Sequence, residues 1–305
     1  MIIGINYSDI NFKNAQKLNT WSLYHNGKVD KVIEYSPKDL DANFIERNKE
    51  ILSMQIGGGY WLWKPYIIRK AYNLLNEGDY LFYCDSGAVV LKPIQTLIES
   101  MEKASTNIMP FQLTFPERMY SKRDAFVLME CDSSEFSDSK QRLSGYMIFK
   151  KATPCSNKPK FFADLDLLLT QWLHFNMDAR IVTDQPNVMN LPNYNDFIEN
   201  RHDQTIWSLL TKKYGIPAFR DPSQYGENTE EFDEDVVKRS LYPIVIDSHR
   251  NRYLKTWREY KRFIQRGRIP PKTNYINRVF ISSKKKLHLF CKYLKDKYTH
   301  EKQDN

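Results

Sequence analysis

The sequence predicts an α/β protein with a largely parallel sheet, and three observations support this fold class. Short β-branched or apolar runs alternate with helix-like runs over the first 250 residues. Pro, Gly and Asn residues separate these runs, and the chain contains no internal sequence repeat. Hydrophobic residues make up 41% of the chain and charged residues 27%, which excludes a chain that is disordered throughout.

Residues 1–101 are predicted to contain three strands and two helices. The strands are apolar or β-branched runs next to turn residues, and each helix begins at a Pro, whose fixed φ suits the first helical turn. Asp85 directly follows the third strand. The predicted strands are Met1–Tyr7, Val29–Tyr35 and Tyr80–Cys84, and the predicted helices are Pro65–Leu75 and Pro93–Met101.

The rest of the body has two predicted strands, two predicted helices and two irregular segments. Residues 111–136 have a mixed polarity that favours no element, and the acidic segment Gln224–Asp235 is typical of a loop. Ligands bind outside the carboxyl ends of parallel strands, which directs attention to Asp85 and to His249. The predicted strands are Leu143–Lys151 and Tyr242–Asp247, and the predicted helices are Phe161–Phe175 and 202–213.

Simple features of the chain exclude several classes of protein. The first residues, Met1–Asn6, lack the basic region and the small-residue cleavage site of a signal peptide. The longest apolar run is far shorter than the ~20 residues that span a bilayer, and the mean hydropathy is −0.61. The four cysteines are scattered without a CxxC pair, so neither a zinc site nor a disulfide framework is predicted. We therefore expect a protein of the reducing cytoplasm.

The net charge of +8 is distributed unevenly along the chain. Residues 250–300 contain 16 Lys and Arg but two acidic residues, whereas residues 1–249 have a net charge of −5. We therefore expect a body, residues 1–250, followed by a basic helical C-terminal segment, residues 251–305. Such a segment favours an anionic partner, which is a membrane surface, a nucleic acid or an acidic protein. A solvated helical face is the plain alternative.

Two apolar runs in the C-terminal segment favour a membrane partner. The first covers residues 253–264 and the second 279–294, and Pro270-Pro271 separates them. Basic residues surround the apolar residues of the second run, as in a helix that lies in the membrane interface. We expect residues 272–298 to bind an anionic membrane surface. For the first run, docking onto the body is an equal alternative.

The segment Asp85-Ser86-Gly87 is the first candidate site. A carboxylate at the carboxyl end of a buried strand can hold Mg²⁺ or Mn²⁺, or it can accept a hydrogen bond from a ribose hydroxyl. Glycine lets the backbone approach a bulky ligand closely. A plain turn after a strand is the alternative interpretation of these three residues.

Three further patterns carry candidate chemistry. In Gly57–Pro65 the aromatic rings can stack on a base or sugar and Lys64 can contact a phosphate, although the tryptophans can equally anchor the core. In Arg201–Gln204 an Asp and a Gln at a helix start can meet a sugar, although Asp is also a good helix cap. In Asp247–Arg250, His249 can supply a nitrogen ligand to a metal held by Asp85, although a lone His is more often structural.

Taken in this order, the patterns resemble those of bacterial glycosyltransferases of the GT-A fold, of the kind that build capsule and lipopolysaccharide O-antigen. The resemblance is carried by Gly58–Tyr66, Gly78–Gly87 and Arg201–Leu210 and covers roughly residues 1–250. It implies a Rossmann-like, mostly parallel sheet flanked by helices. It also implies a hexosyltransferase that moves a sugar from a nucleotide-sugar, by default UDP-linked, to a hydroxyl of a growing surface glycan on a lipid carrier. Such an enzyme would lie at the inner face of the cell membrane.

The resemblance also implies roles for particular residues. Asp85 stands where the first Asp of the DxD motif contacts ribose and metal, and Asp203 with Gln204 looks like the pair beside the anomeric carbon or the acceptor hydroxyl. As general base or as stabiliser of an oxocarbenium-like transition state, Asp203 suits either stereochemical outcome. The donor side comprises Asn6, Tyr7, Lys64, Asp85, Ser86 and Gly87, and the acceptor side comprises Trp63, Ser144, Gly145 and His202.

The chain departs from the family pattern at Gly87, which replaces the second Asp of the motif. A divalent cation, Mn²⁺ or Mg²⁺, is therefore expected only if other ligands such as His249 join Asp85. Two other functions stay open. One is nucleic-acid binding through the basic segment, which the acidic body disfavours, so no nucleic acid is expected. The other is a catalytically inactive scaffold.

Overall fold

The computed structural model describes residues 1–152 and 161–266. Met1–Glu259 form one compact unit, which contains all the elements discussed below except α13, of which it contains only the first three residues. Within the described residues the main sheet comprises six strands in the spatial order β2 (Lys31–Tyr35), β1 (Ile2–Tyr7), β3 (Tyr80–Cys84), β6 (Lys140–Lys150), β5 (Ile108–Pro116) and β7 (Phe219–Arg220).

Most strands of the main sheet run in the same direction. β1 pairs in parallel with β2 and β3, and β5 pairs in parallel with β7. β6 is antiparallel to both of its neighbours, β3 and β5. The predicted α/β class with a mostly parallel sheet is confirmed, and so are the strands predicted over Met1–Tyr7, Val29–Tyr35, Tyr80–Cys84 and Leu143–Lys151, with small shifts at their ends.

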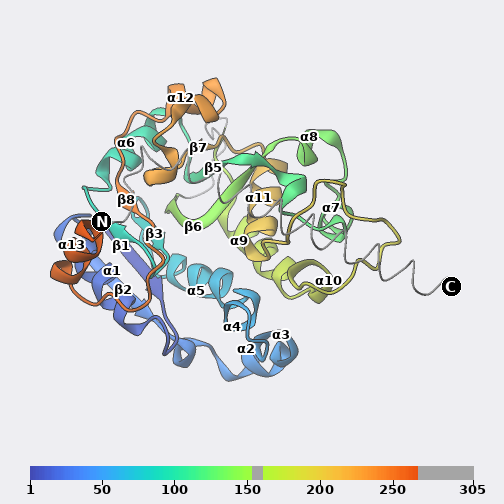
Figure 1. Cartoon of the computed structure of the whole chain (residues 1–305), viewed down its shortest axis with the longest axis horizontal. Helices are drawn as coiled ribbons and strands as arrows, with labels where there is room; N and C mark the ends of the chain where they lie inside the picture. Colours follow the sequence, from blue (N-terminus) through green and yellow to red (C-terminus); the bar gives the residue numbers. More distant parts are fainter. Residues whose placement is uncertain (153–160, 267–305) are drawn as a thin grey trace. The chain divides into compact units, whose positions relative to one another are not determined.

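Helices cover both faces of the sheet (Figure 1). Ile67, Trp172 and Trp207 are buried in one core and belong to α5 (Trp63–Tyr72), α9 (Leu165–Asn176) and α11 (Asp203–Lys213). Leu23 and Ile98 are buried in a second core and belong to α1 (Lys13–His25) and α6 (Gln95–Lys103). Because successive strand residues point to opposite faces, Phe82 and Tyr83 of β3 fall in different cores.

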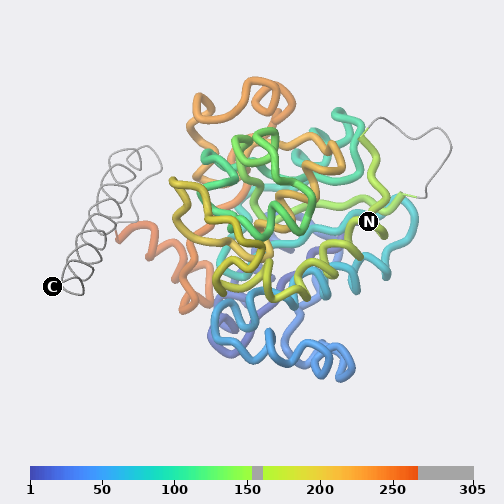
Figure 2. Tube along the Cα trace, turned by 90° about the vertical axis from the view of Figure 1, so that its right-hand side faces the viewer, coloured from blue at the N-terminus to red at the C-terminus, as the bar shows by residue number. Residues whose placement is uncertain are grey.

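The remaining helices are short, and α12 lies far from α2, α3 and α4. In Figures 1 and 2, α2 to α4 are at one end of the unit and α12 is at the opposite end. The bounds are α2 (Ala42–Arg47), α3 (Lys49–Leu52), α4 (Gly57–Tyr60), α7 (Arg123–Leu128), α8 (Ser134–Ser137), α10 (Ala179–Val182), α12 (Glu234–Arg239), α13 (Trp257–Gln265), and the 3-10 turns η1 (Pro37–Asp39), η2 (Glu117–Met119), η3 (Gln224–Gly226) and η4 (Thr229–Glu231).

Three parts of the body differ from the prediction. The last predicted strand, Tyr242–Asp247, is reduced to β8 (Ile246–Asp247), which pairs with β4 (Val89–Val90) in a separate small sheet. Pro243 lies in the lost part and has no N–H for a ladder. The irregular segment 111–136 contains most of β5 together with η2 and α7, and Gln224–Asp235 contains two 3-10 turns and the start of α12.

The C-terminal segment is described up to residue 266. α13 (Trp257–Gln265) overlaps the first predicted run, residues 253–264, and ends one residue after it. The second run, residues 279–294, and the expected membrane segment 272–298 lie outside the described residues. Among the described residues, no helix combines the length and the apolar character that a bilayer crossing requires.

Candidate active site at the carboxyl edge of the sheet

A buried lysine joins two carboxylates at the carboxyl edge of the sheet. Lys64 Nζ lies 2.9 Å from Asp203 Oδ2 and 3.6 Å from Asp85 Oδ1. It also donates to the Ser144 carbonyl at 3.2 Å, and Ser144 Oγ donates to Asp203 Oδ2 at 2.8 Å. Tyr83 donates a short hydrogen bond from its hydroxyl to Asp85 Oδ1. We call Lys64, Asp85 and Asp203 the lysine triad.

Each member of the lysine triad is placed by a different element. Asp85 follows β3 directly, and its backbone N–H donates to the carbonyl of Gly145 on β6 at 2.8 Å. A Cβ atom at Gly145 would lie 3.4 Å from Asp85 Oδ2, so the small residue leaves room for the carboxylate. Asp203 is the first residue of α11, and Lys64 is the second residue of α5. The triad therefore forms only when the sheet and both helices are assembled.

Burial and the neighbouring charges have opposite effects on the pKa values of Lys64 and Asp203. Burial lowers the pKa of Lys64, but the charges of Asp203 and Asp85 outweigh it, so this pKa is raised overall. Burial raises the pKa of Asp203, and the opposing effects of Lys64 and Ser144 do not fully cancel it. Two carboxylates share one ammonium group, which leaves one excess negative charge when all three groups are ionised.

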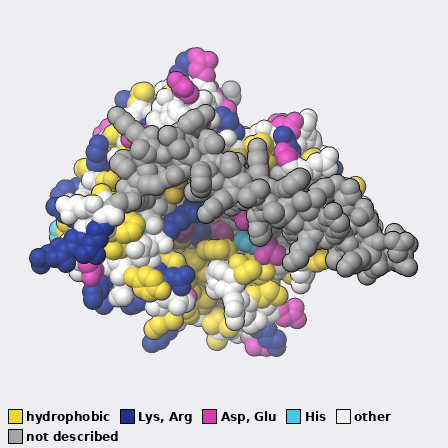
Figure 3. Space-filling model, viewed as in Figure 1, with side chains coloured by type: hydrophobic (Ala, Val, Ile, Leu, Met, Phe, Trp, Pro, Cys, Tyr) yellow, Lys and Arg dark blue, Asp and Glu magenta, His cyan; other side chains and the backbone are white. Residues whose placement is uncertain are grey.

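The two carboxylates differ in their access to solvent. The side chain of Asp85 is 42% exposed, whereas that of Asp203 is 5% exposed. Asp85 can therefore meet a ligand directly, whereas Asp203 is buried. Figure 3 shows basic, acidic and histidine side chains gathered at the centre of the visible face.

The glycine-rich segment before Lys64 forms a left-handed turn. Gly57 to Trp61 all have φ between +51° and +94°. A Cβ atom at Gly59 would lie 2.6 Å from the Leu52 Cα atom, so glycine is required there. Tyr60 and Trp61 are in the same region, which costs roughly 1–2 kcal/mol for each non-glycine residue. This strained turn leads directly into Trp63 and Lys64, and strain of this kind is concentrated at functional sites.

Trp63 connects the strained turn to the end of β1. Its ring stacks on Tyr7 with 3.7 Å between the ring centroids, and its Nε1 donates to the Gly57 carbonyl at 2.9 Å. Ser86 Oγ donates to the Tyr7 carbonyl at 2.6 Å. The structure thus brings Tyr7 and Trp63 next to the Asp85-Ser86-Gly87 segment, and Tyr7 remains partly exposed.

Three other residues predicted at the site, Asn6, Gln204 and His202, are buried, and their polar groups form hydrogen bonds within the protein. Asn6 is 0% exposed, and its amide group bonds only with side chains of α1 among the described residues. Gln204 Oε1 accepts the N–H of Ser144 at 3.3 Å, and its amide group donates to Gln141 at 2.8 Å. His202 Nδ1 is 2.8 Å from the Val182 carbonyl, and its ring lies against Tyr60 and Trp61.

The predicted metal ligands do not offer a suitable donor set. His249 Nδ1 accepts the backbone N–H of Asn251 at 2.8 Å, so the other ring nitrogen carries the proton in the neutral imidazole. Asp85 Oδ1 already interacts with Tyr83 and Lys64. Mg²⁺ prefers six oxygen ligands, and no group of three His, Cys, Asp or Glu in the described residues is arranged to hold a metal ion. These residues therefore do not fit the expected divalent cation.

Sequence reasoning missed Tyr83 and Gln141 as parts of the site. A signal existed for Tyr83, because residues two apart in a strand share a face and Tyr83 precedes Asp85 by two positions. For Gln141 we see no such signal, because it reaches the site through Gln204 on α11, far away in the sequence.

The fold and the site define an α/β protein with an acidic ligand site at the carboxyl edge of its sheet. No family model matches the chain, and no curated protein matches it by sequence. Similar solved structures are glycosyltransferases. One is the galactosyltransferase LgtC in complex with donor and acceptor sugar analogues, with 12% identity and a TM-score of 0.43 over 81% of this chain and 86% of LgtC. Another is mouse xyloside xylosyltransferase 1, with 11% identity and a TM-score of 0.45 over 81% of this chain and 97% of the xylosyltransferase.

A further similar structure is the glycosyltransferase GlyE of Streptococcus pneumoniae, with 12% identity and a TM-score of 0.40 over 81% of this chain and 54% of GlyE. With identities of 11–12% and TM-scores below 0.5, these likenesses assign no residue role and no substrate to this chain.

Proposed function

We propose that this protein is a glycosyltransferase that moves a sugar from a nucleotide-sugar to a hydroxyl acceptor. The observation that carries the proposal is the lysine triad, in which an exposed carboxylate, Asp85, and a buried one, Asp203, share Lys64 at the ligand edge of an α/β sheet. Glycosyl transfer needs a group that orients the donor and a carboxylate near the acceptor hydroxyl or the anomeric carbon. The triad supplies both groups in one place.

The residues of the site divide the work as follows. Asp85 accepts a hydrogen bond from the donor, and Tyr83 and Lys64 hold its carboxylate in place. Asp203 and Gln204 act beside the reacting bond, where the raised pKa of Asp203 makes its carboxylate a stronger base than an ordinary aspartate. Lys64 is a positioning residue, because its ammonium group is buried against both carboxylates. The same arrangement serves an inverting or a retaining reaction.

The two sides of the site take the two substrates. On the donor side Tyr7 offers a partly exposed ring for the base, while Ser86 and Gly87 border the sugar-phosphate. To the acceptor side we assign Ser144, which donates to Asp203, together with Gly145, Trp63 and His202. We propose a UDP-linked hexose as donor and a growing capsule or O-antigen glycan as acceptor.

Nucleotide binding is the first test of the proposal. Thermal-shift measurements with UDP, GDP and CMP should show one nucleotide that stabilises the protein, by ~2.7 kcal/mol at one hundred times its Kd. A shift with none of them would favour a nucleic-acid-binding protein or an inactive scaffold. Hydrolysis or transfer of the matching nucleotide-sugar then separates an enzyme from a scaffold that binds nucleotides.

Asp85→Asn tests the exposed carboxylate. We expect transfer and donor hydrolysis to be lost while the melting temperature stays nearly unchanged, because this side chain is 42% exposed. Activity and circular-dichroism melting are measured on the same preparation. A large loss of stability with normal activity would make Asp85 a structural turn residue.

We also propose that the protein is cytoplasmic and binds the inner face of the membrane through residues 272–298. The support is their sequence, in which basic residues surround apolar ones, and each basic residue near an anionic surface contributes ~1 kcal/mol. Removal of residues 272–305 should release the protein from anionic vesicles at low salt and preserve donor hydrolysis. Equal sedimentation of the full-length and truncated proteins with vesicles would disprove this role.

A further inference from the structure

The lysine triad leaves a charge problem for a nucleotide-sugar. Asp85 and Asp203 outnumber Lys64, and Lys64 is 3% exposed, so its charge is used within the triad. A nucleotide-sugar carries negative charge on both phosphates, and more charge develops on the leaving diphosphate as the sugar departs. A site with excess negative charge requires additional positive charge for this leaving group. The donors that would hold a metal ion do not fit, as described above.

The loop after β8 places an arginine directly against the Asp85-Ser86-Gly87 segment. The backbone N–H of Arg250 donates to the Gly87 carbonyl at 2.7 Å. A Cβ atom at Gly87 would lie 3.3 Å from the Arg250 Cα atom, closer than a side chain normally approaches backbone. The backbone of Arg250 therefore crowds the place where the second Asp of a metal-binding motif would stand.

Arg250 also has features of a ligand-binding residue. Its φ of +55° is unusual for a residue with a side chain, and the hydrogen bond to Gly87 holds this conformation. The residue is exposed, and among the described residues no carboxylate forms an ion pair with it. Its guanidinium group lies 6.0 Å from the centre of the Tyr225 ring.

A second arginine lies near Arg250. The Arg201 guanidinium lies over the Tyr120 ring at 3.7 Å and the Phe115 ring at 4.7 Å. Burial is the main cause that lowers the pKa of Arg201, and the positive charge of Arg250 lowers it further. Arg201 is two residues before Asp203 of the triad. Arg201 Nε also lies 3.8 Å from Glu199 Oε1, and its guanidinium group repels that of Arg250, so an anion bound beside both groups would stabilise both.

We propose that Arg250, assisted by Arg201, binds the diphosphate of the donor and takes the place of a divalent cation. This inference rests on the proposed glycosyl transfer and specifies how its leaving group is stabilised. Guanidinium groups suit this task, because they donate two parallel hydrogen bonds to phosphate oxygens and remain charged at every physiological pH. Lys64 then holds the carboxylates, and the arginines hold the phosphates.

The test measures the binding of UDP, or of GDP or CMP if one of these gives the thermal shift, by calorimetry in the presence of EDTA. We expect binding without metal and little change when Mn²⁺ replaces EDTA. Arg250→Ala should weaken the nucleotide about tenfold to a hundredfold, because charge-assisted hydrogen bonds are lost. Arg250→Lys should recover part of this loss. Arg252→Ala is the matched control, because Arg252 lies over the Phe12 ring, and it should bind nucleotide normally.

The outcomes separate this inference from the proposed function. If nucleotide binds only with Mn²⁺ and equally well to Arg250→Ala and to the unchanged protein, the arginine role is wrong and the glycosyltransferase proposal stands. If no nucleotide binds under either condition, the proposed function itself fails. Equal weakening by Arg250→Ala and Arg252→Ala would show a general effect of charge and would also overturn the assignment. The melting temperature of each variant shows whether it is folded.

Discussion

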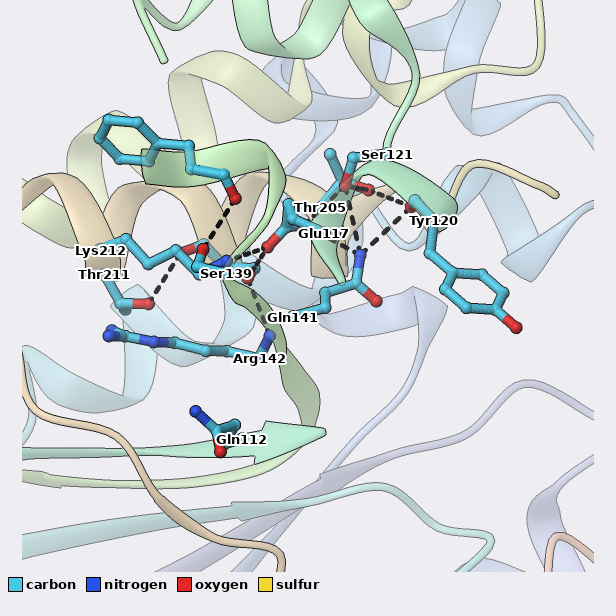
Figure 4. A network of polar contacts seen from close by, with 12 residues as sticks. Gln112, Glu117, Tyr120, Ser121, Ser139, Gln141, Arg142, Thr205, Thr211 and Lys212 are labelled. Carbon is cyan, nitrogen blue, oxygen red and sulfur yellow. Dashed lines mark hydrogen bonds and ion pairs between the residues drawn. The ribbon is translucent and has the colours of Figure 1, made fainter. Parts of the chain in front are cut away.

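Helix α11 contributes one residue to each of two buried ion pairs. Only one of these pairs is connected to a solvent-exposed side chain. At its first residue, Asp203 pairs with Lys64, and the network continues to Asp85, whose side chain is 42% exposed. Near its end, Lys212 Nζ lies 2.5 Å from Glu117 Oε2, and Glu117 is 0% exposed. Figure 4 shows this second network, which we call the Glu117 network.

Gln141 links the Glu117 network to Gln204 of the site, but Glu117 itself is fully buried, whereas the lysine triad includes the exposed carboxylate of Asp85. Glu117 accepts hydrogen bonds from Ser121, Gln141, Ser208 and Lys212, so both of its oxygens are used within the protein. A buried charge is tolerated when it is paired and hydrogen-bonded in this manner. The lysine triad has an extra carboxylate at the surface instead. A network whose charged groups are all paired inside the protein stabilises the fold, whereas the exposed carboxylate of the lysine triad is the part that we propose binds a ligand.

Breaking the Glu117 network should have the largest effect on stability. Glu117→Gln removes the charge that faces Lys212, and Arg142 Nη1, buried nearby, has no hydrogen-bond partner among the described residues. We expect the free energy of unfolding to fall by about 3–5 kcal/mol, because a buried cation is left unpaired. Urea unfolding measures this loss.

A double variant controls for this effect. Glu117→Gln combined with Lys212→Met removes both charges and should recover much of the stability, because a buried pair replaced by groups without charge is often neutral. Turnover per folded molecule should stay normal in both variants. A loss of turnover with stability unchanged would place the Glu117 network in the active site and remove the contrast between the two networks.

The next largest effect concerns the buried carboxylate of the lysine triad. Asp203→Asn keeps the shape of the side chain, so we expect turnover to fall by ~10² or more while nucleotide affinity is retained. Steady-state kinetics and nucleotide titration on the same sample test this. Normal turnover with a lower melting temperature would make Asp203 only a structural partner of Lys64.

The sequence predicted the members of the lysine triad separately but not the triad itself. Asp85 was visible because it follows an apolar strand, and Asp203 because it starts a helix. The ion pairs join residues on three elements, and a single sequence contains no direct signal for such long-range contacts. Lys64 was expected to bind phosphate, but the structure buries its ammonium group between the two carboxylates. Whether it contacts a donor stays a prediction.

Helix α1 was not predicted from the sequence, and the polar residues of its buried face explain why. Helix α1 has a buried face that includes Gln16, Asn19 and Ser22. These side chains bond to Asn6, to the Ala88 carbonyl and to other buried groups. They stand among the buried apolar residues Ala15, Leu18 and Leu23 and so weaken the apolar periodicity that marks an amphipathic helix. Strands were easier to predict, because their buried residues are apolar and contiguous.

The pKa values of Lys64 and Lys212 should differ from that of an ordinary lysine in opposite directions. The pKa of Lys64 is raised above 10.5, whereas burial lowers the pKa of Lys212 despite the nearby Glu117. Lys64 therefore contributes stability that is fully present below pH 10.5 and is lost as the pH rises through its folded-state pKa. Lys212 binds its proton less tightly when folded, so its contribution rises with pH until 10.5.

NMR of the lysine side chains, assigned through the backbone, measures both values directly. We expect Lys212 to lose its proton before Lys64 as the pH is raised. The reverse order would show that the Glu117 network stabilises its cation more strongly than the lysine triad does.

The smallest expected effect compares one serine hydroxyl in each network. Ser144 Oγ donates to Asp203 Oδ2 at 2.8 Å, and Ser208 Oγ donates to Glu117. Each Ser→Ala change should cost about 1 kcal/mol of stability.

Ser144→Ala also removes a hydrogen bond that favours the charged form of Asp203, so the pKa of Asp203 rises further. The acidic limb of the turnover profile should then move to higher pH, because Asp203 must be deprotonated to act as a base. Ser208→Ala should leave that limb in place. An equal displacement in both variants, or in neither, would mean that another group sets the limb.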